Sequence, residues 1–366
     1  MLVRMVKGPA TVVVDGECRV LGSDVSGRMV KVRPGKALPF EPLKGCRLRV
    51  KLSRGGRMWM ATPEEAGVSM WYDVARHVSA LQSSNYNSDK KVAMVVMLAG
   101  DSDTGKSTLA TYLANVALGN GLTPCIIDGD IGQGDLAPPT GIGAAVISET
   151  LTDLRDASAT LYEFIGNTSP IGFEHLVAKK LRSILERTML LGDVCIVNTD
   201  GYARGGGVQY KLMLANAIRP NMIVCLENSI LLNTLKGGPW KVVSARASSQ
   251  VAKTRLERRS RRLDQFLRHV GSGLTSADLS LVKFVYMDSI FSPSALDNPP
   301  IVQLKPENMA RMFVGLGSNG LVTGFGIIAG IGSGKIDIQT DVAHFDRIYL
   351  SNIRLRRDMP LEIRIA

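Results

Sequence analysis

The sequence predicts a central α/β domain with a mainly parallel sheet, flanked by a small N-terminal and a small C-terminal all-β domain. Three patterns carry this prediction. From Val92, apolar runs such as VAMVVMLAG, PCIID and DVCIVNTD alternate with helical segments, which is typical of parallel strands buried on both faces. Near the N-terminus, short alternating runs surround the turns Asp15-Gly16 and Gly55-Gly56. A glycine-rich strand pattern returns from about Pro300.

The chain of 366 residues is long enough for two or three domains, and the patterns place boundaries near residues 85 and 295. We expect an N-terminal β domain of short strands and turns over 1–85, the central domain over 86–295, and a C-terminal β domain over 296–366. A polar stretch, Gln82 to Lys91 (QSSNYNSDKK), is the expected first linker.

The composition is that of an ordinary globular protein with a basic surplus: 45% of the residues are hydrophobic, 21% are charged, and the formal net charge is +11. Such a surplus favours a polyanionic partner, either nucleic acid or a membrane surface, although composition alone equally allows a basic protein without one. The first residues lack the features of a secretory signal, and no run reaches ~18 consecutive apolar residues. We therefore expect no membrane association.

The five cysteines (18, 46, 125, 195 and 225) show no C-x-x-C pairing, and three lie in apolar runs. This pattern predicts buried thiols in a reducing cytoplasm and no metal site at these residues. A Cys18–Cys46 bridge stays open as the alternative.

A phosphate-binding loop is predicted at Gly100 to Thr108 (GDSDTGKST), which matches G-x-x-x-x-G-K-[ST]. The loop follows an apolar strand and opens a helical segment, so backbone N–H groups and the positive end of the helix can face phosphate oxygens. Lys106 would reach the β- and γ-phosphates, and the Ser107 hydroxyl would bind Mg²⁺. The central domain is therefore predicted to be a P-loop NTPase domain that binds ATP or another NTP, with a chance match as the alternative. The predicted nucleotide-binding residues are Gly100, Asp103, Thr104, Gly105, Lys106, Ser107 and Thr108.

Two carboxylates follow the strand PCIID, in the segment Asp128-Gly-Asp130-Ile-Gly-Gln133. Residues two apart on a strand point the same way, so both carboxylates are expected to face the phosphates. One can help to hold Mg²⁺ through water, and the other can accept a proton from an attacking hydroxyl. The alternative is a turn that is merely rich in Asp and Gly.

An arginine-rich segment, Lys253 to Phe266 (KTRLERRSRRLDQF), is predicted to be helical. Arg255 and Arg259 lie one turn apart, as do Arg258 and Arg262, so each pair shares a face. Planar guanidinium groups suit the spread charge of a phosphoryl transition state. A solvated basic helix, or a nonspecific grip on a phosphate backbone, is the alternative.

Four segments together resemble the polynucleotide 5′-hydroxyl kinase family, which includes the kinase subunit of messenger-RNA 3′-end processing machinery, the pre-ribosomal-RNA processing kinases and shorter archaeal relatives. DGDIGQGDLAPPTGIG resembles the family's D-x-D-x-G-Q motif, and FIGNTSP (Phe164 to Pro170) its clasp. NTDGYARGGG (Asn198 to Gly207) resembles N-T-x-G-[WY]-x-x-G-x-G, and the arginine-rich segment resembles the lid. The likeness extends to both flanking β domains.

The resemblance implies a role for each matching residue. Lys106 and Ser107 would hold phosphates and metal, with Asp128 supporting Mg²⁺ and Asp130 acting as general base on the 5′-hydroxyl. Arg258 and Arg262 would close over the transferring phosphoryl group as catalytic residues of the lid. Tyr202, where many members have Trp, would stack on the terminal base of the acceptor strand. The remaining residues implied in substrate binding are Gln133, Thr168, Ser169, Thr199, Arg255 and Arg259.

The implied activity is transfer of the γ-phosphate of ATP, or of another NTP, to the 5′-hydroxyl end of RNA, with DNA as a further candidate acceptor. Two alternatives are a nucleotide-binding assembly factor of an RNA-processing complex and a P-loop ATPase of the partitioning or metal-insertion kind. The intact Lys106 and Asp130 favour the kinase over the assembly factor, because a scaffold needs no general base.

Overall fold

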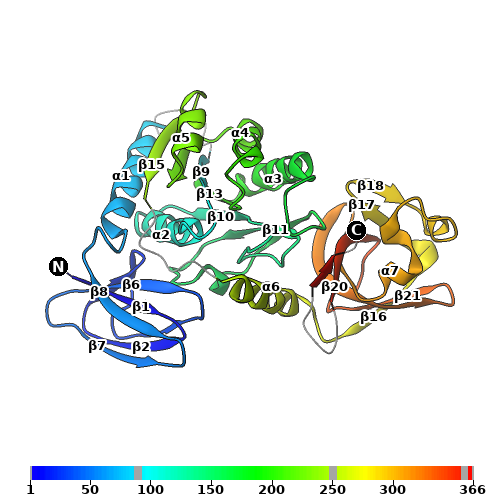
Figure 1. The fold of residues 1–366 in the computed structure, drawn as a ribbon, viewed down its shortest axis with the longest axis horizontal. Coiled ribbons are helices and arrows are strands. Elements are labelled where there is room, and N and C mark those ends of the chain that lie inside the picture. Colours follow the sequence, from blue (N-terminus) through cyan, green and yellow to red (C-terminus); the bar gives the residue numbers. More distant parts are fainter. Residues whose placement is uncertain (1, 86–92, 247–253, 356–361, 365–366) are drawn as a thin grey trace. The chain divides into compact units, whose positions relative to one another are not determined.

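The computed structural model describes residues 2–85, 93–246, 254–355 and 362–364 (Figure 1). The chain forms two compact units. The first consists of Met1–Ile127, Ala145–Ser158 and Leu185–Glu257, and the second of Asp128–Ala144, Ala159–Ile184 and Arg258–Ala366.

The first unit begins with two small antiparallel sheets. One has the order β4-β3-β6-β1-β8, and the other the order β5-β2-β7. Alternate residues of β2 are buried, as expected for a strand with one face on a core and one on solvent. The strands are β1 (Val3–Lys7), β2 (Ala10–Asp15), β3 (Cys18–Val20), β4 (Ser23–Asp24), β5 (Met29–Val32), β6 (Ala37–Pro42), β7 (Arg47–Leu52) and β8 (Arg57–Ala61).

Residues 68–85 form a helix, α1 (Val68–Asn85), although the sequence analysis assigns them to strands and turns of the N-terminal β domain. Helix α1 contacts helix α2 (Lys106–Gly119) and strand β15 (Lys241–Ala245) of the same unit. Its buried residues Val68, Trp71, Val74 and Val78 recur every three or four positions, so one helical face lies on the core. The expectation for these residues was wrong because this periodicity was missed. The expected linker lies in part in α1, and its residues 86–91 lie outside the described ones.

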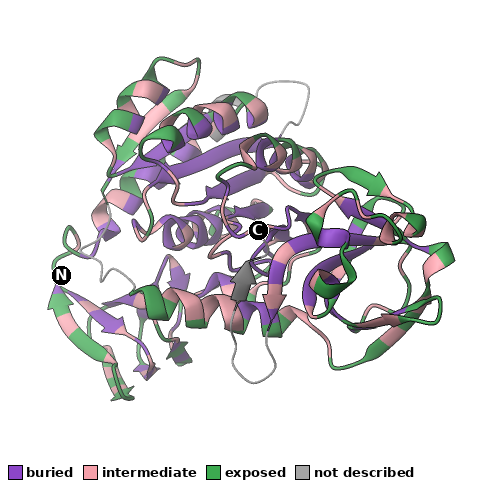
Figure 2. Cartoon of the chain, turned by 45° about the vertical axis from the view of Figure 1, so that its right-hand side comes forward, coloured by how far each residue is buried: buried purple, intermediate pink, exposed green. Residues whose placement is uncertain are grey.

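The central sheet of the first unit is mainly parallel, as predicted. Its order is β15-β14-β9-β13-β10, and β9 runs parallel to both β13 and β14, which in turn runs parallel to β15. Every residue of β9, β13 and β14 is buried, and the strands of the central sheet are purple, the colour of buried residues, in Figure 2. The strands are β9 (Met94–Gly100), β10 (Pro124–Gly129), β13 (Val194–Thr199) and β14 (Met222–Leu226). The unit also contains the helices α4 (Gly206–Ile218) and α5 (Ser229–Lys236) and a 3₁₀ turn at Leu154–Asp156. Helix α3 (Glu174–Thr188) belongs to the second unit as far as Ile184 and to the first from Leu185.

The second unit is mainly antiparallel. Its strand order is β11-β12-β20-β19-β22-β17-β18, with β21 pairing both β20 and β16, and β23 pairing β22. The pair of β17 and β22 is parallel. The strands are β11 (Gly141–Val146), β12 (Leu161–Phe164), β16 (Leu274–Asp278), β17 (Lys283–Tyr286), β18 (Ser289–Phe291), β19 (Met312–Ser318), β20 (Leu321–Gly332), β21 (Lys335–Gln339), β22 (Arg347–Leu355) and β23 (Glu362–Arg364).

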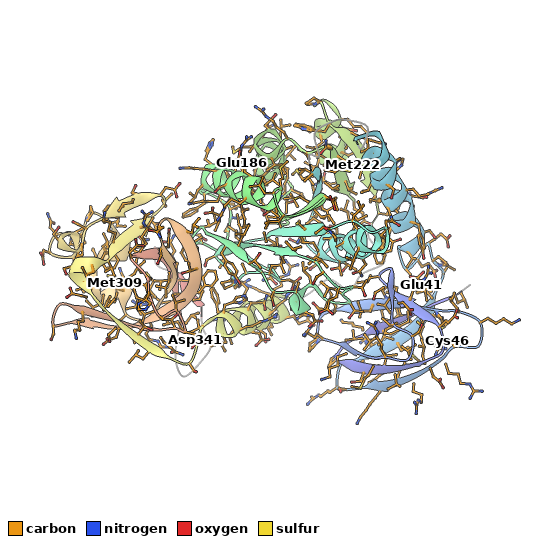
Figure 3. The ribbon with its side chains drawn as sticks, turned by 180° about the vertical axis from the view of Figure 1, so that it is seen from behind. Glu41, Cys46, Glu186, Met222, Met309 and Asp341 are labelled. Atoms are coloured by element: carbon orange, nitrogen blue, oxygen red, sulfur yellow. The ribbon has the colours of Figure 1, made fainter. Side chains whose placement is uncertain are left out.

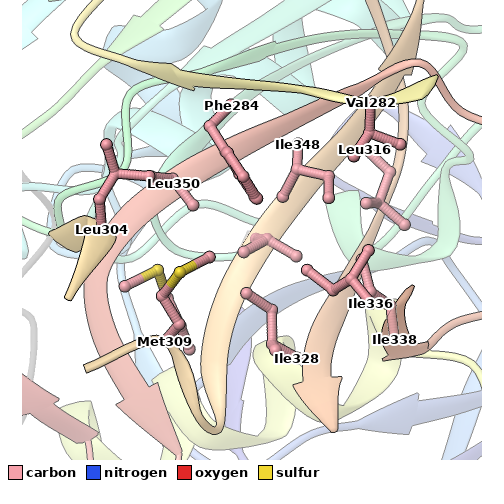
Figure 4. Packing of buried hydrophobic residues seen from close by; sticks show 12 residues of the cluster. Val282, Phe284, Leu304, Met309, Leu316, Ile328, Ile336, Ile338, Ile348 and Leu350 are labelled. Atoms are coloured by element: carbon pink, nitrogen blue, oxygen red, sulfur yellow. The ribbon is translucent and has the colours of Figure 1, made fainter. Parts of the chain in front are cut away.

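Helix α6 (Arg255–His269) follows β12 and precedes β16 in this unit. Helix α7 (Pro306–Met309) and 3₁₀ turns at Leu279–Leu281, Pro293–Leu296 and Val302–Leu304 lie between the strands from β16 to β19. Strands β16 and β17 precede residue 296, yet they pair with strands of the C-terminal region. The domain boundaries at 85 and 295 stay a prediction. Figure 4 shows an apolar core of the second unit, in which Phe284 of β17, Ile328 of β20 and Ile348 of β22 are each fully buried.

Candidate functional site

The predicted phosphate loop connects β9 to α2, and its glycines are required by its shape. Gly100 has φ +152°, and a Cβ there would lie 2.5 Å from the carbonyl oxygen of Leu226 on the neighbouring strand β14. Gly105 precedes the first residue of α2 in the left-handed region, with φ +90°, as does Asp103 with φ +61°. The chain therefore turns sharply into the helix, which leaves the N–H groups of the first helical turn at the loop.

Lys106 is buried within this loop, with 6% of its surface exposed. Its Nζ donates to the carbonyl oxygens of Gly100, at 2.9 Å, and Asp101, at 2.6 Å. Thr104 Oγ1 also donates to the Asp101 carbonyl, at 2.9 Å. The ammonium group is therefore held at the turn of the loop, where phosphate oxygens are expected.

Asn198, at the end of β13, fixes the Ser107 hydroxyl: Asn198 Nδ2 donates to Ser107 Oγ at 3.1 Å. The sequence analysis gave Asn198 no role. Thr108 follows in the first turn of α2 and is buried. The loop and the C-terminal end of β13 thus meet through side chains.

Asp101 of the phosphate loop makes two further side-chain contacts that the sequence analysis missed. Its carboxylate accepts from Arg204 Nε at 2.8 Å and from Asn228 Nδ2 at 3.3 Å, and it raises the pKa of the Arg204 guanidinium. Asn228 also caps helix α5 by accepting from the Leu231 N–H at 2.9 Å. The loop is therefore tied to the segment after β13 and to the start of α5.

Segment 198–207 is built around a buried carboxylate, Asp200, which is 4% exposed. Asp200 accepts from the Tyr202 N–H at 2.8 Å, from Tyr210 Oη at 2.8 Å and from Lys211 Nζ at 2.9 Å. Lys211 is fully buried. This ion pair joins the segment to helix α4, and the sequence analysis named neither partner as functional.

Thr199 turns its hydroxyl into the sheet, where Oγ1 donates to the Leu98 carbonyl at 2.8 Å, and the residue is 1% exposed. This geometry favours a structural role for the hydroxyl over the implied contact with acceptor phosphates.

Tyr202 is half-buried, and its ring lies 5.9 Å from that of Tyr210. The glycines of this segment make room for neighbouring protein atoms. A Cβ on Gly206 would lie 2.7 Å from Tyr202 Oη, and one on Gly201 would lie 2.1 Å from Ser102 Oγ of the phosphate loop. The glycines at 201 and 206 are therefore explained by tight packing against the phosphate loop and Tyr202.

Asp128 lies in the second unit, at the end of β10, and is 1% exposed. Its carboxylate accepts from the Asp135 N–H at 2.5 Å, the Leu136 N–H at 3.4 Å and the Asp130 N–H at 3.3 Å. Asp128 therefore organises the loop that follows it.

Asp130 follows the last residue of β10, Gly129, so the alternation of side chains along a strand does not extend to it. It is half-buried, and its Oδ1 accepts from the N–H groups of Gly132, at 3.1 Å, and Gln133, at 2.9 Å. Asp130 is therefore the more accessible of the two predicted carboxylates, and its own loop orients it.

The clasp lies against this loop. A Cβ on Gly132 would lie 2.8 Å from the carbonyl oxygen of Thr168. Ser169 is held by a turn in which its N–H donates to Asn167 Oδ1 at 3.0 Å and its Oγ accepts from the Ile171 N–H at 3.3 Å. The second unit thus brings the D-x-D-x-G-Q motif and the clasp together, as the resemblance implies.

Helix α6, the predicted lid, is fastened to the same loop, in part by Arg261 and Gln265, to which the sequence analysis gave no role. Arg261 pairs with the buried carboxylate of Asp135 at 2.5 Å, and Gln265 Nε2 donates to the Gly134 carbonyl at 2.8 Å. Gln133 Nε2 donates to the carbonyl of Arg258 at 3.2 Å.

These contacts orient the arginines of α6. Arg258, Arg259 and Arg262 are half-buried, and Arg255 is exposed at the first residue of the helix. Lys253 lies outside the described residues. Arg261 is thus used for docking, and the arginines predicted to act on phosphate, Arg258, Arg259 and Arg262, lie on the same and the adjoining turns of α6.

All five cysteines are free thiols. Among the described helices, none combines the length and the hydropathy that crossing a membrane requires. The cytoplasmic location stays a prediction.

A buried parallel sheet, a glycine loop leading into a helix and a buried loop lysine define this protein as a P-loop nucleotide-binding protein. Residues 100–269, just under half of the chain, match the family model of the "mRNA cleavage and polyadenylation factor CLP1 P-loop". The family resemblance of the motifs is thereby confirmed.

Curated relatives agree with this assignment. The chain is 37% identical over 178 residues to a polyribonucleotide 5′-hydroxyl-kinase of Pyrococcus abyssi, covering 48% of this chain and 50% of that one. It is 26% identical over 311 residues to one of Pyrococcus furiosus, covering 72% and 88%. The matched region thus spans about half the length of the first of these relatives.

The fold is shared with a solved structure, the complex of wild-type Clp1p with a segment of Pcf11p. The TM-score is 0.70 over 96% of both chains, at 14% sequence identity. The likeness confirms the predicted fold class along nearly the whole chain.

Proposed function

We propose that this protein is a polynucleotide 5′-hydroxyl kinase, which transfers the γ-phosphate of ATP or another NTP to the 5′-hydroxyl end of RNA. DNA is the further candidate acceptor. The observation that carries the proposal is Asp130, a half-buried carboxylate oriented by two backbone N–H groups in a P-loop protein. A protein that only binds nucleotide has no use for such a base. The proposal is supported by relatives named as polyribonucleotide 5′-hydroxyl-kinases.

The donor nucleotide binds at the phosphate loop. Backbone N–H groups of the loop and of the first turn of α2 bind phosphate oxygens. Lys106 Nζ exchanges its two carbonyl acceptors, on Gly100 and Asp101, for oxygens of the β- and γ-phosphates.

Oxygen donors at this site suit Mg²⁺, a hard cation. Ser107 Oγ, which Asn198 holds in place, would bind it directly. Asp128 already accepts three backbone N–H groups, so a water-mediated contact suits it better than direct ligation. When bound, the ion would neutralise charge on the β- and γ-phosphates.

The acceptor hydroxyl reacts in one displacement. Asp130 accepts the proton of the 5′-hydroxyl, whose oxygen forms a bond to the γ-phosphorus while the bond to the bridging oxygen breaks, releasing the nucleoside diphosphate. Arg258 and Arg262 neutralise charge on the transferring group. Tyr202 stacks on the terminal base, and the clasp residues Thr168 and Ser169 contact acceptor phosphate.

The test is transfer of label from γ-labelled ATP, with Mg²⁺, to 5′-hydroxyl RNA and DNA 24-mers. Asp130→Asn should lower kcat by about 10²–10⁴-fold while nucleotide binding is retained, because only proton transfer is lost. Lys106→Ala should lose nucleotide binding as well. Asp297→Asn, at an exposed carboxylate in the second unit, is the matched control and should leave kcat unchanged.

Two outcomes would contradict the proposal. Tight ATP binding without labelled oligonucleotide would favour the nucleotide-binding assembly factor. Release of labelled phosphate without labelled oligonucleotide would favour an ATPase.

A further inference from the structure

The basic surplus of this protein is concentrated at its N-terminus. Residues 1–61 contain thirteen Lys or Arg side chains against four acidic ones, a surplus of nine within a net charge of +11. The other 305 residues, five-sixths of the chain, therefore carry a net charge of only +2. The proposed site, with its lid, does not use this N-terminal charge.

Much of the charge lies on one face of the three-stranded sheet β5-β2-β7. Because side chains alternate along each strand, Thr11, Val13 and Asp15 of β2 share this face with the residues that pair with them. Thr11 lies between Lys31 and Lys51, Val13 between Met29 and Arg49, and Asp15 opposite Arg47. We call this surface the basic sheet face; its cations are Lys31, Arg47, Arg49 and Lys51, all exposed.

The orientation of the basic sheet face is fixed by the opposite side of the same sheet. Val12 and Val14 of β2, and Val30 and Val32 of β5, are at most 6% exposed. A shift by one residue would expose these valines and bury the cations, so the register is strongly determined. Figure 3 shows long nitrogen-tipped side chains projecting outward from these strands, around Cys46, the residue before β7.

The protein itself neutralises little of this charge. Within the part of the chain that the structure describes, none of the four cations forms an ion pair, and Asp15 is the only acidic residue among the paired positions of this face. Arg47, Arg49 and Lys51 lie two residues apart on the same side of β7, so their charges repel one another, and a bound polyanion would relieve that repulsion.

We propose that the basic sheet face binds the phosphate backbone of the acceptor RNA, at nucleotides away from the 5′ end that receives phosphate. This inference rests on the proposed function for the identity of the strand. Arg47, Arg49 and Lys51 follow one another at about 6.6 Å along β7, a regular row that suits a regularly charged backbone. The face carries no aromatic residue on which bases could stack, so binding should be independent of sequence.

Other polyanions fit the basic sheet face less well. A protein partner would need an apolar centre, but the middle of this face is Thr11 and Val13, flanked by cations. A membrane surface would favour large apolar side chains that insert among lipids, and Met29 is the only one at these positions.

The experiment measures binding of the full-length protein to 3′-labelled 5′-hydroxyl RNA 24-mers by fluorescence anisotropy, without nucleotide, at several salt concentrations. The test variant replaces Lys31, Arg47, Arg49 and Lys51 by Gln. The control variant replaces four exposed lysines elsewhere by Gln, with the same loss of charge: Lys236, Lys241, Lys305 and Lys335.

Four phosphate contacts to a single strand contribute about 3 to the slope of log K against log salt concentration. The slope measured for the test variant should therefore be smaller by about 3, and the variant should bind RNA on the order of 10²-fold more weakly at 0.1 M salt. The loss of affinity should be the same for the RNA oligomers A₂₄ and U₂₄. The control variant should bind within about threefold of wild type, because its lost charges are not clustered. Phosphorylation of a trinucleotide should be unchanged in both variants, since a trinucleotide is too short to extend far from the reacting end.

Equal losses in the two variants, no loss in the test variant, or no RNA binding by wild type would each overturn the inference. So would tighter binding to polyglutamate or to anionic phosphatidylserine vesicles than to RNA. Because binding is measured without phosphoryl transfer, these outcomes are distinct from failure of the kinase proposal, which is judged on the trinucleotide.

Discussion

Replacing Lys211 by Met should destabilise the first unit strongly. Lys211 is fully buried, and its Nζ lies 2.9 Å from Asp200 Oδ1, which is itself almost fully buried. Removing the ammonium leaves the Asp200 charge buried without its cation, while the Tyr202 N–H and the Tyr210 hydroxyl still donate hydrogen bonds to it. Breaking a buried pair in this way costs about 3–5 kcal/mol. Because domains are stable by only about 5–15 kcal/mol, the unfolded fraction should rise by about two to four powers of ten.

Urea unfolding followed by tryptophan fluorescence measures the loss of stability of the first unit, because Trp59, Trp71 and Trp240 all belong to that unit. The double variant Asp200→Asn/Lys211→Met removes both charges, so it should be more stable than Lys211→Met alone. We expect a coupling energy of about 2–4 kcal/mol. Lys236→Met, at an exposed lysine, is the matched control and should change stability by less than about 0.5 kcal/mol.

The result that would refute this reasoning is a cost below about 1 kcal/mol for Lys211→Met, or a double variant whose cost equals the sum of the two single ones. Either would mean that Asp200 is solvated well enough not to need its partner. The same cycle tests the site, because Asp200 also holds the Tyr202 backbone. Asp200→Asn should therefore raise KM for the acceptor more than it lowers kcat.

Two further predictions concern the phosphate loop and pH. Gly201→Ala should weaken ATP binding by about tenfold or more in calorimetry, because the new Cβ would lie 2.1 Å from Ser102 Oγ of the phosphate loop. The control is Gly119→Ala, whose Cβ would meet nothing within 4 Å and which should leave ATP binding unchanged. Burial opposes ionisation of Asp153, but Lys36 and Arg155 outweigh it and hold the pKa of its carboxyl well below the usual range. Because the pKa of Asp153 is lower in the folded than in the unfolded state, where it is ~3.9, the ionised carboxyl stabilises the fold at neutral pH, and this contribution is lost as the pH falls below ~3.9. The urea midpoint of the wild type should therefore drop between pH 5 and pH 3. The drop should be less steep in Asp153→Asn. An equally steep drop in that variant would show that other titratable groups cause the loss of stability at low pH.

Local patterns were sufficient for the central sheet and the phosphate loop. A strand such as β9 is buried on both faces, so its sequence is apolar throughout, and the loop's glycines are fixed by backbone geometry within nine residues. Helix α1 was missed although its buried residues recur with helical spacing. Asp130 was assigned by alternation along a strand that in fact ends one residue earlier, at Gly129.

The sequence by itself determined the fold class, the phosphate loop and the family, because these depend on contiguous residues with short-range geometric requirements. Only the tertiary structure decided which charged residues act as supports. Arg261 pairs with Asp135, 126 residues away, and Lys211 lies buried against Asp200. In the sequence these residues look like others of their kind, such as the remaining arginines of α6. Their role follows from burial and from the partner that folding brings to each of them, and no local pattern contains that information.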